Sequence, residues 1–455
     1  MSFFTIPVSH IKSFINKGHA RSVNAKKNII ASFLIKGGSI GISLLLLPLT
    51  IHYVNPAQYG IWLTLSSIIG WFSLFDIGFG QGLRNKFTEA VAKGDHELAR
   101  IYVSTTYAIL SFIIGIALIV FFCINPFLNW AKILNTSSAM AGEVRILALI
   151  VFVFFSIQFV MQLLTIILIA NQQPAKASFL NFLGSLFALI IIFFLTKTTE
   201  GNLVYLGAAF SSAPVAILAV ASIWYFSGEY KRYIPSIKYV KFKYAANLMS
   251  LGAKFFIIQI GVLVLLQTDN IVIIQLFTSK EVTTYNIAYK LFSIILVIFS
   301  IIMAPMWSAF TDAYTKQDFE WIRQLFTKIQ KLFWLLILLT IFMLALSPVL
   351  FKLWIGDQVK IPFYLSIAMA VYAITNSWLL IPCFLLNGIG KVKLQLYLYV
   401  VCIFINIPIS FLLGRFYGLV GIAASNILIF VAMSILLSIQ CNKIINNTAK
   451  GIWAQ

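Results

Sequence analysis

Long apolar runs recur about a dozen times in this sequence, and they constrain its fold more than any other feature. A helix needs ~20 apolar residues to cross the hydrocarbon core of a membrane. Hydrophobic residues make up 61% of the chain and charged residues only 10%, more apolar surface than a soluble domain carries. We expect spans at 28–51, 58–82, 101–125, 146–170, 178–196, 202–226, 247–276, 284–310, 329–350, 362–386, 394–413 and 418–440. The sequence therefore predicts an all-α integral membrane protein of about 12 transmembrane helices.

Basic residues outnumber acidic ones, and the formal net charge is +20. This excess does not indicate nucleic-acid binding, because most of the charges lie between the apolar runs. If the N-terminus lies inside, 23 of the 33 Lys and Arg residues fall in inside segments, counting Lys331 at the inner edge of its span, 7 in outside segments and 3 deeper within spans. Cytoplasmic loops of membrane proteins carry such an excess. We therefore expect both termini to be cytoplasmic.

The two halves of the chain resemble each other. Residues 87–100, FTEAVAKGDHELAR, and residues 310–323, FTDAYTKQDFEWIR, are identical at seven positions and lie 223 residues apart. Each follows the second span of its half. Because each half has an even number of spans, both halves share one orientation, and the repeat is parallel with its pseudo-twofold axis along the membrane normal.

This organisation predicts two six-helix lobes with basic segments around them. A lead-in rich in lysine and arginine precedes the first span and is expected to be amphipathic and to lie at the cytoplasmic surface. The expected parts are the lead-in at 1–27, the N-terminal lobe at 28–226, a basic cytoplasmic linker at 227–246, the C-terminal lobe at 247–440 and a cytoplasmic tail at 441–455.

Two segments carry a resemblance to a known family. Residues 44–90 contain an apolar span ending in proline, a short turn ending in Tyr-Gly and a second span closing with Asp-x-Gly-x-Gly. Residues 268–293, TDNIVIIQLFTSKEVTTYNIAYKLFS, carry related features, although Asn286 stands where the family pattern has glycine. These segments resemble the polysaccharide-transporter, or O-antigen flippase, branch of the multidrug/oligosaccharidyl-lipid/polysaccharide (MOP) flippase superfamily.

The resemblance implies a fold and a function. The fold would be a V-shaped pair of six-helix bundles around a central cavity, in a bacterial inner membrane. The function would be to flip undecaprenyl-diphosphate-linked oligosaccharide repeat units by alternating access, for O-antigen, capsule or exopolysaccharide. No cofactor is implied, and coupling to H⁺ or Na⁺ is left open. The expected partners are this lipid-linked glycan and membrane lipids, with a polysaccharide polymerase and chain-length machinery as further candidates.

Five ionisable residues fall inside expected spans, away from the inner edge of the span where Lys331 lies: Lys36, Asp76, Lys254, Asp269 and Lys290. Each costs ~2.5–3.5 kcal/mol or more at a helix centre, so such residues usually face a wet cavity or pair with one another. Depth along the helices makes Asp76 a candidate partner for Lys36, and Asp269 for Lys290. Either aspartate is equally a candidate for binding a coupling ion.

The lysines of the first and seventh spans are the main candidates for contacting a lipid diphosphate. Lys36 shares a polar stripe with Ser32, Ser39 and Ser43 at helical spacing. Lys254 lies at nearly the same depth in the repeat-equivalent helix, and a lysine ammonium is a suitable point charge for phosphate. For both residues the alternative is a lysine that snorkels to the headgroups.

Three further residues complete the predicted site. Arg84, at the inner end of the second span, would widen the basic mouth, although positive-inside bias explains it equally well. Gln259 is a candidate for hydrogen-bonding sugar hydroxyls, and interhelical bonding is the alternative. Pro305 is the candidate hinge, because proline inside a span kinks a helix.

Catalysis and metal binding are not indicated. No histidine falls mid-span, and there is no Walker A motif and no CxxC pair among the four cysteines. The closer alternative is a multidrug antiporter of the same superfamily that exports organic cations. Such a site should be lined by carboxylates and aromatic faces, whereas the spans hold three lysines against two aspartates. This balance favours an anionic lipid substrate.

Overall fold

The computed structural model describes residues 20–76, 78–171 and 173–454, without the side chains of 20–33 and of some positions in 250–259 and 304–315. The described chain is helical and contains no β-strand. The first half consists of α2 (Ala20–Val54), α3 (Pro56–Gly70), η1 (Trp71–Asp76), α4 (Phe79–Ala92), α5 (His96–Ile124), α6 (Trp130–Ile133), α7 (Ala141–Met161), α8 (Leu163–Ala170), α9 (Pro174–Thr198) and α10 (Leu203–Ser227). The second half consists of α11 (Ala245–Leu276), α12 (Ser279–Thr315), α13 (Phe319–Ile355), α14 (Phe363–Ile389) and α15 (Lys393–Ile445).

The expected transmembrane helices are present. By length and composition, nine described helices are able to cross a membrane, and ten if the bent pair of α3–η1 and α4 counts as one span. The long helix α15 contains two spans, because its backbone breaks at Gly418, where φ is 63°. With α11, the prediction of an all-α membrane protein with about 12 transmembrane helices is confirmed.

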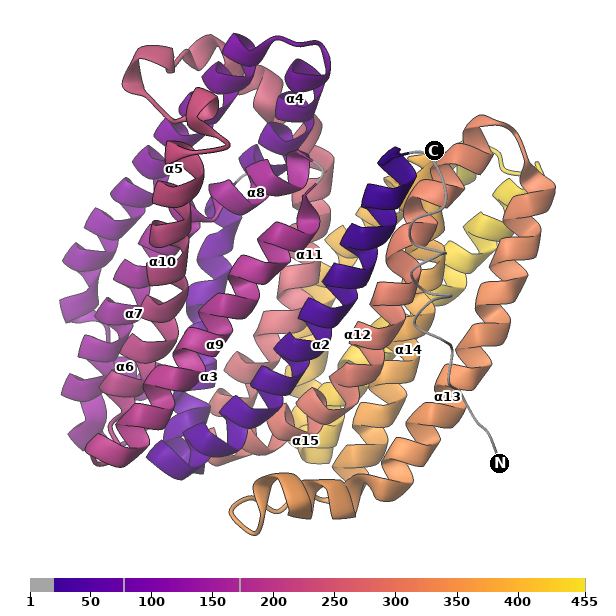
Figure 1. Ribbon diagram of the computed structural model, residues 1–455. Coiled ribbons are helices and arrows are strands. Elements are labelled where there is room, and N and C mark those ends of the chain that lie inside the picture. The colour runs from indigo at the N-terminus through magenta and orange to yellow at the C-terminus, as the bar shows by residue number, and fades with distance from the viewer. Residues whose placement is uncertain (1–19, 77, 172, 455) are drawn as a thin grey trace, which may run out of the picture.

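The helices form two lobes that lie side by side (Figure 1). In the N lobe, α2 to α10, α9 packs against α2 and α10, and α10 packs against α7. In the C lobe, α11 to α15, the main contacts join α12 with α14 and α15 with α11 and α14. We name the end that holds residues 228–244 (the linker) and the C-terminus the linker end, and the opposite end the far end (Figure 1).

Large apolar side chains on the outside of both lobes remain exposed. Phe112 of α5, Trp334 of α13 and Phe404 of α15 are each about two-thirds exposed or more. Soluble proteins rarely expose contiguous apolar surface on this scale. These faces are therefore the surface that contacts lipid.

The internal repeat has a common structure in both halves. Asp95 caps α5 by accepting a hydrogen bond from Leu98 N at 2.9 Å, and Asp318 caps α13 by accepting one from Trp321 N at 3.0 Å. Phe87 and the matching residue Phe310 are both fully buried. The two matched segments thus form the same buried helix end, turn and N-cap, which confirms the parallel repeat.

Some boundaries differ from the sequence prediction. Residues 20–27 of the expected lead-in belong to α2, and α15 continues to Ile445, beyond the expected start of the tail. Residues 1–19 lie outside the described part of the chain. The expected span 58–82 is broken, since α3–η1 and α4 are bent by 45° relative to each other.

The break follows from the Asp-x-Gly-x-Gly motif. Gly78 has φ 82°, a left-handed conformation that glycine adopts without strain. The Asp76 carboxylate then accepts a hydrogen bond from Gly80 N at 2.8 Å, so it occupies the N-terminal end of α4, where backbone donors lack helical partners. A Cβ on Gly80 would lie 3.1 Å from this carboxylate. The motif is therefore a helix break with its own cap.

Candidate functional site

A cavity of about 620 Å³ lies between the lobes. Its walls are α2 and α12, and Tyr59 and Leu63 of α3 line it near the far end. On α12 the lining extends from Asn286 to Ser300, which is ~10 to ~31 Å from the far-end start of the helix at 1.5 Å per residue. The cavity thus runs through much of a hydrocarbon core that is ~30 Å thick.

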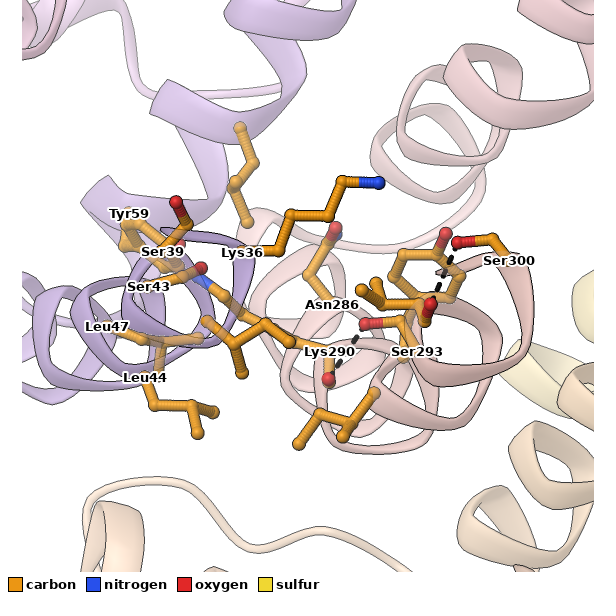
Figure 2. A pocket seen from close by; sticks show the side chains of 15 residues that line it. Lys36, Ser39, Ser43, Leu44, Leu47, Tyr59, Asn286, Lys290, Ser293 and Ser300 are labelled. Carbon is orange, nitrogen blue, oxygen red and sulfur yellow. Dashed lines mark hydrogen bonds between the residues drawn. The ribbon is translucent and has the colours of Figure 1, made fainter. Parts of the chain in front are cut away.

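Polar side chains from both lobes face each other across this cavity (Figure 2). Lys36 extends from α2 toward α12, and Lys290 extends from α12 toward α2. The other polar lining residues are Ser39, Ser43, Tyr59, Asn286, Tyr289, Ser293 and Ser300. Of the expected stripe, Lys36, Ser39 and Ser43 therefore lie on the cavity side of α2, and the side chain of Ser32 is outside the described part of the structure.

The two lysines occupy different depths. Lys290 is ~16 Å along α12 from the far end, whereas Lys36 is ~27 Å along α2 from the far end. Among the described side chains, no carboxylate lies within 4.0 Å of either ammonium group. The cavity therefore carries two positive charges without a described counter-ion, one near mid-membrane and one toward the linker end.

The expected pairing of Asp269 with Lys290 is wrong. Asp269 is buried, and it accepts hydrogen bonds from Tyr285 Oη at 2.7 Å and from Asn426 Nδ2 at 2.9 and 3.0 Å. Asn406 donates in turn to Asn426 at 3.0 Å. The carboxylate thus faces the interior of the C lobe, toward α15, whereas Lys290 faces the cavity on the other side of α12.

The expected pairing of Asp76 with Lys36 is also wrong, because the Asp76 carboxylate caps α4. Arg84 is exposed on α4 and is not part of the cavity lining. Lys254, Gln259 and Pro305 lie in α11 and α12 at positions whose side chains are outside the described part of the structure. Their assigned roles stay predictions.

The lobes are joined at the far end by side chains that bond to the opposite backbone. Asn135, after α6, donates to Ile274 O at 3.0 Å and to Phe277 O at 2.7 Å. Gln275 donates back to Ile133 O at 2.6 Å. We name these bonds, with those of Thr283 to Pro56 O at 2.5 Å and of Asn270 to Ser67 Oγ at 2.8 Å, the far-end clasp.

Close backbone packing reinforces the clasp. A Cβ placed on Gly60 of α3 would lie only 1.7 Å from Ser279 O at the start of α12. Only glycine permits this approach, which seals the interface below the cavity. Asn286 connects the two regions, because it lines the cavity and donates to Asn270 of the clasp at 2.6 Å.

Sequence reasoning missed Asn286 and Asn135 as interface residues. Asn286 carried one signal, since it replaces the glycine of the family pattern. Asn135 carried none, because its partners lie 139 and 142 residues away in the chain.

Comparisons with known proteins agree with this architecture. The family described as "Polysaccharide biosynthesis protein" matches residues 25–311, more than half of the chain, and the MatE family matches residues 255–412. A Salmonella typhi protein named as an O-antigen transporter is 24% identical over 407 residues, which cover 88% of this chain and 91% of that protein. A Yersinia pseudotuberculosis protein named as an O-antigen export protein is 23% identical over 367 residues, covering 78% and 81%.

The fold also matches a solved structure. A multidrug resistance MATE family transporter of the MOP superfamily, in an inward-facing conformation, superposes with a TM-score of 0.74 at 14% identity, covering 90% of this chain and 95% of that chain. This similarity establishes the two-bundle fold. The chain belongs to the polysaccharide biosynthesis protein family, within the polysaccharide-transporter branch of the MOP superfamily, and is a membrane transporter rather than an enzyme.

Proposed function

We propose that this transporter flips undecaprenyl-diphosphate-linked oligosaccharide repeat units across a bacterial inner membrane, with its linker end in the cytoplasm. The observation that carries the proposal is the cavity between α2 and α12, lined by Lys36 and Lys290. The names of the Salmonella and Yersinia relatives support a polysaccharide cargo. The excess of lysine and arginine in the linker-end segments supports the orientation.

The charge of the cavity favours a phosphate-bearing lipid. An unpaired ammonium at membrane depth is unfavourable unless water or an anion accompanies it. A diphosphate between Lys36 and Lys290 would neutralise both and gain charge-assisted hydrogen bonds. An organic cation would meet two like charges, so the cavity disfavours the alternative of a multidrug antiporter.

The uncharged polar residues suit the sugar portion of the cargo. Asn286 carries an amide, and Ser43 and Ser300 carry hydroxyls, at different heights along the walls. Amides and hydroxyls both donate and accept hydrogen bonds, as sugar hydroxyls require. Aliphatic side chains lie between them, such as Leu44 and Val297. They make no hydrogen bonds that would hold a sugar at one depth, which fits a cargo that moves along the cavity.

The far-end clasp defines the barrier that transport must open. In this structure the lobes are bonded to each other at the far end, below the cavity. We therefore propose that the headgroup enters from the linker end and leaves after the clasp breaks, by rocking of the lobes about the fixed site. Coupling to H⁺ or Na⁺ stays a hypothesis, and the buried Asp269 is its candidate group.

A strain deleted for this gene tests the proposal. Lipid-linked glycan should accumulate on the cytoplasmic side, and the wild-type gene should restore export. The double variant Lys36→Gln/Lys290→Gln should fail to restore export at equal membrane abundance, whereas Lys360→Gln, on an exposed far-end loop, should restore it. Full export by the double variant would refute the role of the cavity, and cation export without glycan export would support the antiporter.

A further inference from the structure

The linker that joins the lobes carries an unusual combination of exposed side chains. Five of its residues are cationic, and all five are exposed: Lys231, Arg232, Lys238, Lys241 and Lys243. Between them, Ile237 is 92% exposed and Phe242 is 67% exposed. Isolated exposed apolar residues are ordinary, but an isoleucine and a phenylalanine that are largely exposed among lysines are typical of segments at a lipid–water boundary.

The linker is held in place along the side of the N lobe. Arg100 of α5 donates from Nε to Ile234 O at 3.1 Å, and its guanidinium lies 4.1 Å from the ring centre of Tyr239. Further along α5, Ser104 Oγ accepts from Ser236 N at 3.1 Å and Thr105 Oγ1 accepts from Lys241 N at 3.0 Å. The path of the linker is therefore fixed by bonds to two successive turns of α5.

These bonds also set the depth of the linker. α5 has 29 residues and is thus ~44 Å long, which matches a bilayer including its headgroup layers and exceeds the ~30 Å hydrocarbon core. Arg100 to Thr105 lie ~6 to ~14 Å from the linker-end start of α5. A segment bonded there runs beside the helix, at the level where headgroups meet acyl chains.

The positive charge of the linker is not neutralised by its own acidic residue. Glu229 pairs with Lys176 of α9 at 2.7 Å and accepts a hydrogen bond from Gln173 at 2.9 Å. These two donors hold the pKa of Glu229 below its usual range, so it stays ionised and engaged with α9. The five linker cations therefore face outward without it.

The adjoining helix marks the same boundary. α10 ends directly before the linker, and its last turns expose Ile223 at 70% and Trp224 at 77%. Tryptophan is enriched at membrane–water interfaces. The lipid-facing side of α10 thus leads directly to the linker, which the buried side chains of Tyr230 and Tyr233 anchor to the core of the N lobe.

We propose that residues 234–243 form a binding surface for anionic phospholipid headgroups, with Lys238, Lys241 and Lys243 on the phosphates and Ile237 and Phe242 inserted between the lipids. Juxtamembrane lysines attract anionic lipids, and inserted apolar side chains add affinity that salt does not screen. The surface holds the N lobe and the joint between lobes at one leaflet. It is independent of the transported substrate.

A depth measurement on the full-length protein tests this surface. Ile237→Cys carries an environment-sensitive fluorophore in a Cys123→Ser background, since the other three cysteines are buried. The protein is reconstituted in phosphatidylcholine vesicles, with or without phosphatidylglycerol, that contain a nitroxide lipid labelled near the headgroup. The control label is at Lys93→Cys, an exposed position in the turn between α4 and α5 at the same end.

The label at 237 should be quenched by the nitroxide lipid, and more strongly when phosphatidylglycerol is present, while the label at 93 stays unquenched. Lys238→Gln/Lys241→Gln/Lys243→Gln should reduce the preference for phosphatidylglycerol by roughly fivefold per lysine. A label at 237 as accessible to water as the control, or quenching unaffected by phosphatidylglycerol, would overturn the proposal. If the true partner of this surface were an acidic soluble protein, phosphatidylglycerol would leave the quenching of the label at 237 unchanged. A thermal unfolding curve for each variant verifies that it is folded.

Discussion

Loss of the Asn135 side chain should shift the protein toward a state that is open at the far end. Its amide donates two hydrogen bonds to carbonyl groups at the end of α11, in the other lobe. In Asn135→Ala both carbonyls lose this partner. At ~0.5–1.5 kcal/mol net per bond, the closed state loses ~1–3 kcal/mol, or roughly 5- to 150-fold in its ratio to the open state.

Distance measurements between spin labels report this ratio directly. Labels at Ser137 of the N lobe and Gln358 of the C lobe are both on exposed far-end loops, and Cys123→Ser removes the exposed native thiol. Asn135→Ala should add or enlarge a population with a longer distance. The wild-type distribution should be dominated by the short distance of the closed clasp.

A matched control separates opening from general destabilisation. Asn202, also at the far end, caps α10 by accepting from Tyr205 N at 3.0 Å, within the N lobe. Asn202→Ala should lower thermal stability by ~1 kcal/mol without changing the distance. If Asn135→Ala leaves the distance distribution unchanged, or if Asn202→Ala changes it equally, the clasp does not hold the lobes together.

Variants at three further sites, Gly60, Asp76 and Asp269, test the packing and the buried polar groups, each by thermal unfolding in detergent. Gly60→Ala should destabilise the fold by several kcal/mol, because its Cβ would collide with Ser279 O. In the control variant Gly115→Ala the new Cβ meets nothing within 4 Å, so this variant should be neutral or slightly stabilising. Equal effects of the two substitutions would refute the close approach of α3 and α12. Asp76→Ala should lower the free energy of unfolding by ~1 kcal/mol and Asp76→Asn by much less, because asparagine also caps helices. Equal losses of stability in the two variants would show that Asp76 does not cap α4. Asp269→Leu should lower the free energy of unfolding by ~2–4 kcal/mol, because it leaves the buried Tyr285 and Asn426 side chains unpaired. Unchanged stability would show that the hydrogen bonds of Asp269 do not stabilise the fold.

Much of the fold was predictable because membrane crossing imposes a simple rule on sequence. Each span must be ~20 residues long and apolar, so the spans can be recognised in the sequence. The repeat could be recognised from matching residues such as Phe87 and Phe310, because the same buried turn recurs in both halves. The break after Asp76 was missed although its signal was present. Gly78 and Gly80 beside an aspartate are the residues that a left-handed turn and a close cap require.

The side-chain partners were less predictable. Depth in the membrane made Asp269 a candidate partner for Lys290, but depth does not determine which way a side chain points around its helix. The partner of Asp269, Asn426, lies 157 residues away, and no local pattern indicates that contact. Lys36 differed because its serine neighbours formed a stripe, and a stripe does indicate which face of a helix is polar.

Lipid binding to the purified protein in nanodiscs tests whether Lys36 and Lys290 bind the phosphate groups of a lipid carrier. Native mass spectrometry compares undecaprenyl diphosphate with undecaprenol, which has the same chain and no phosphate. Wild-type protein should prefer the diphosphate by about tenfold or more, as charged hydrogen bonds imply, and Lys36→Gln/Lys290→Gln should lose this preference. Equal binding of both lipids by the wild type, or an undiminished preference in the double variant, would contradict the claim.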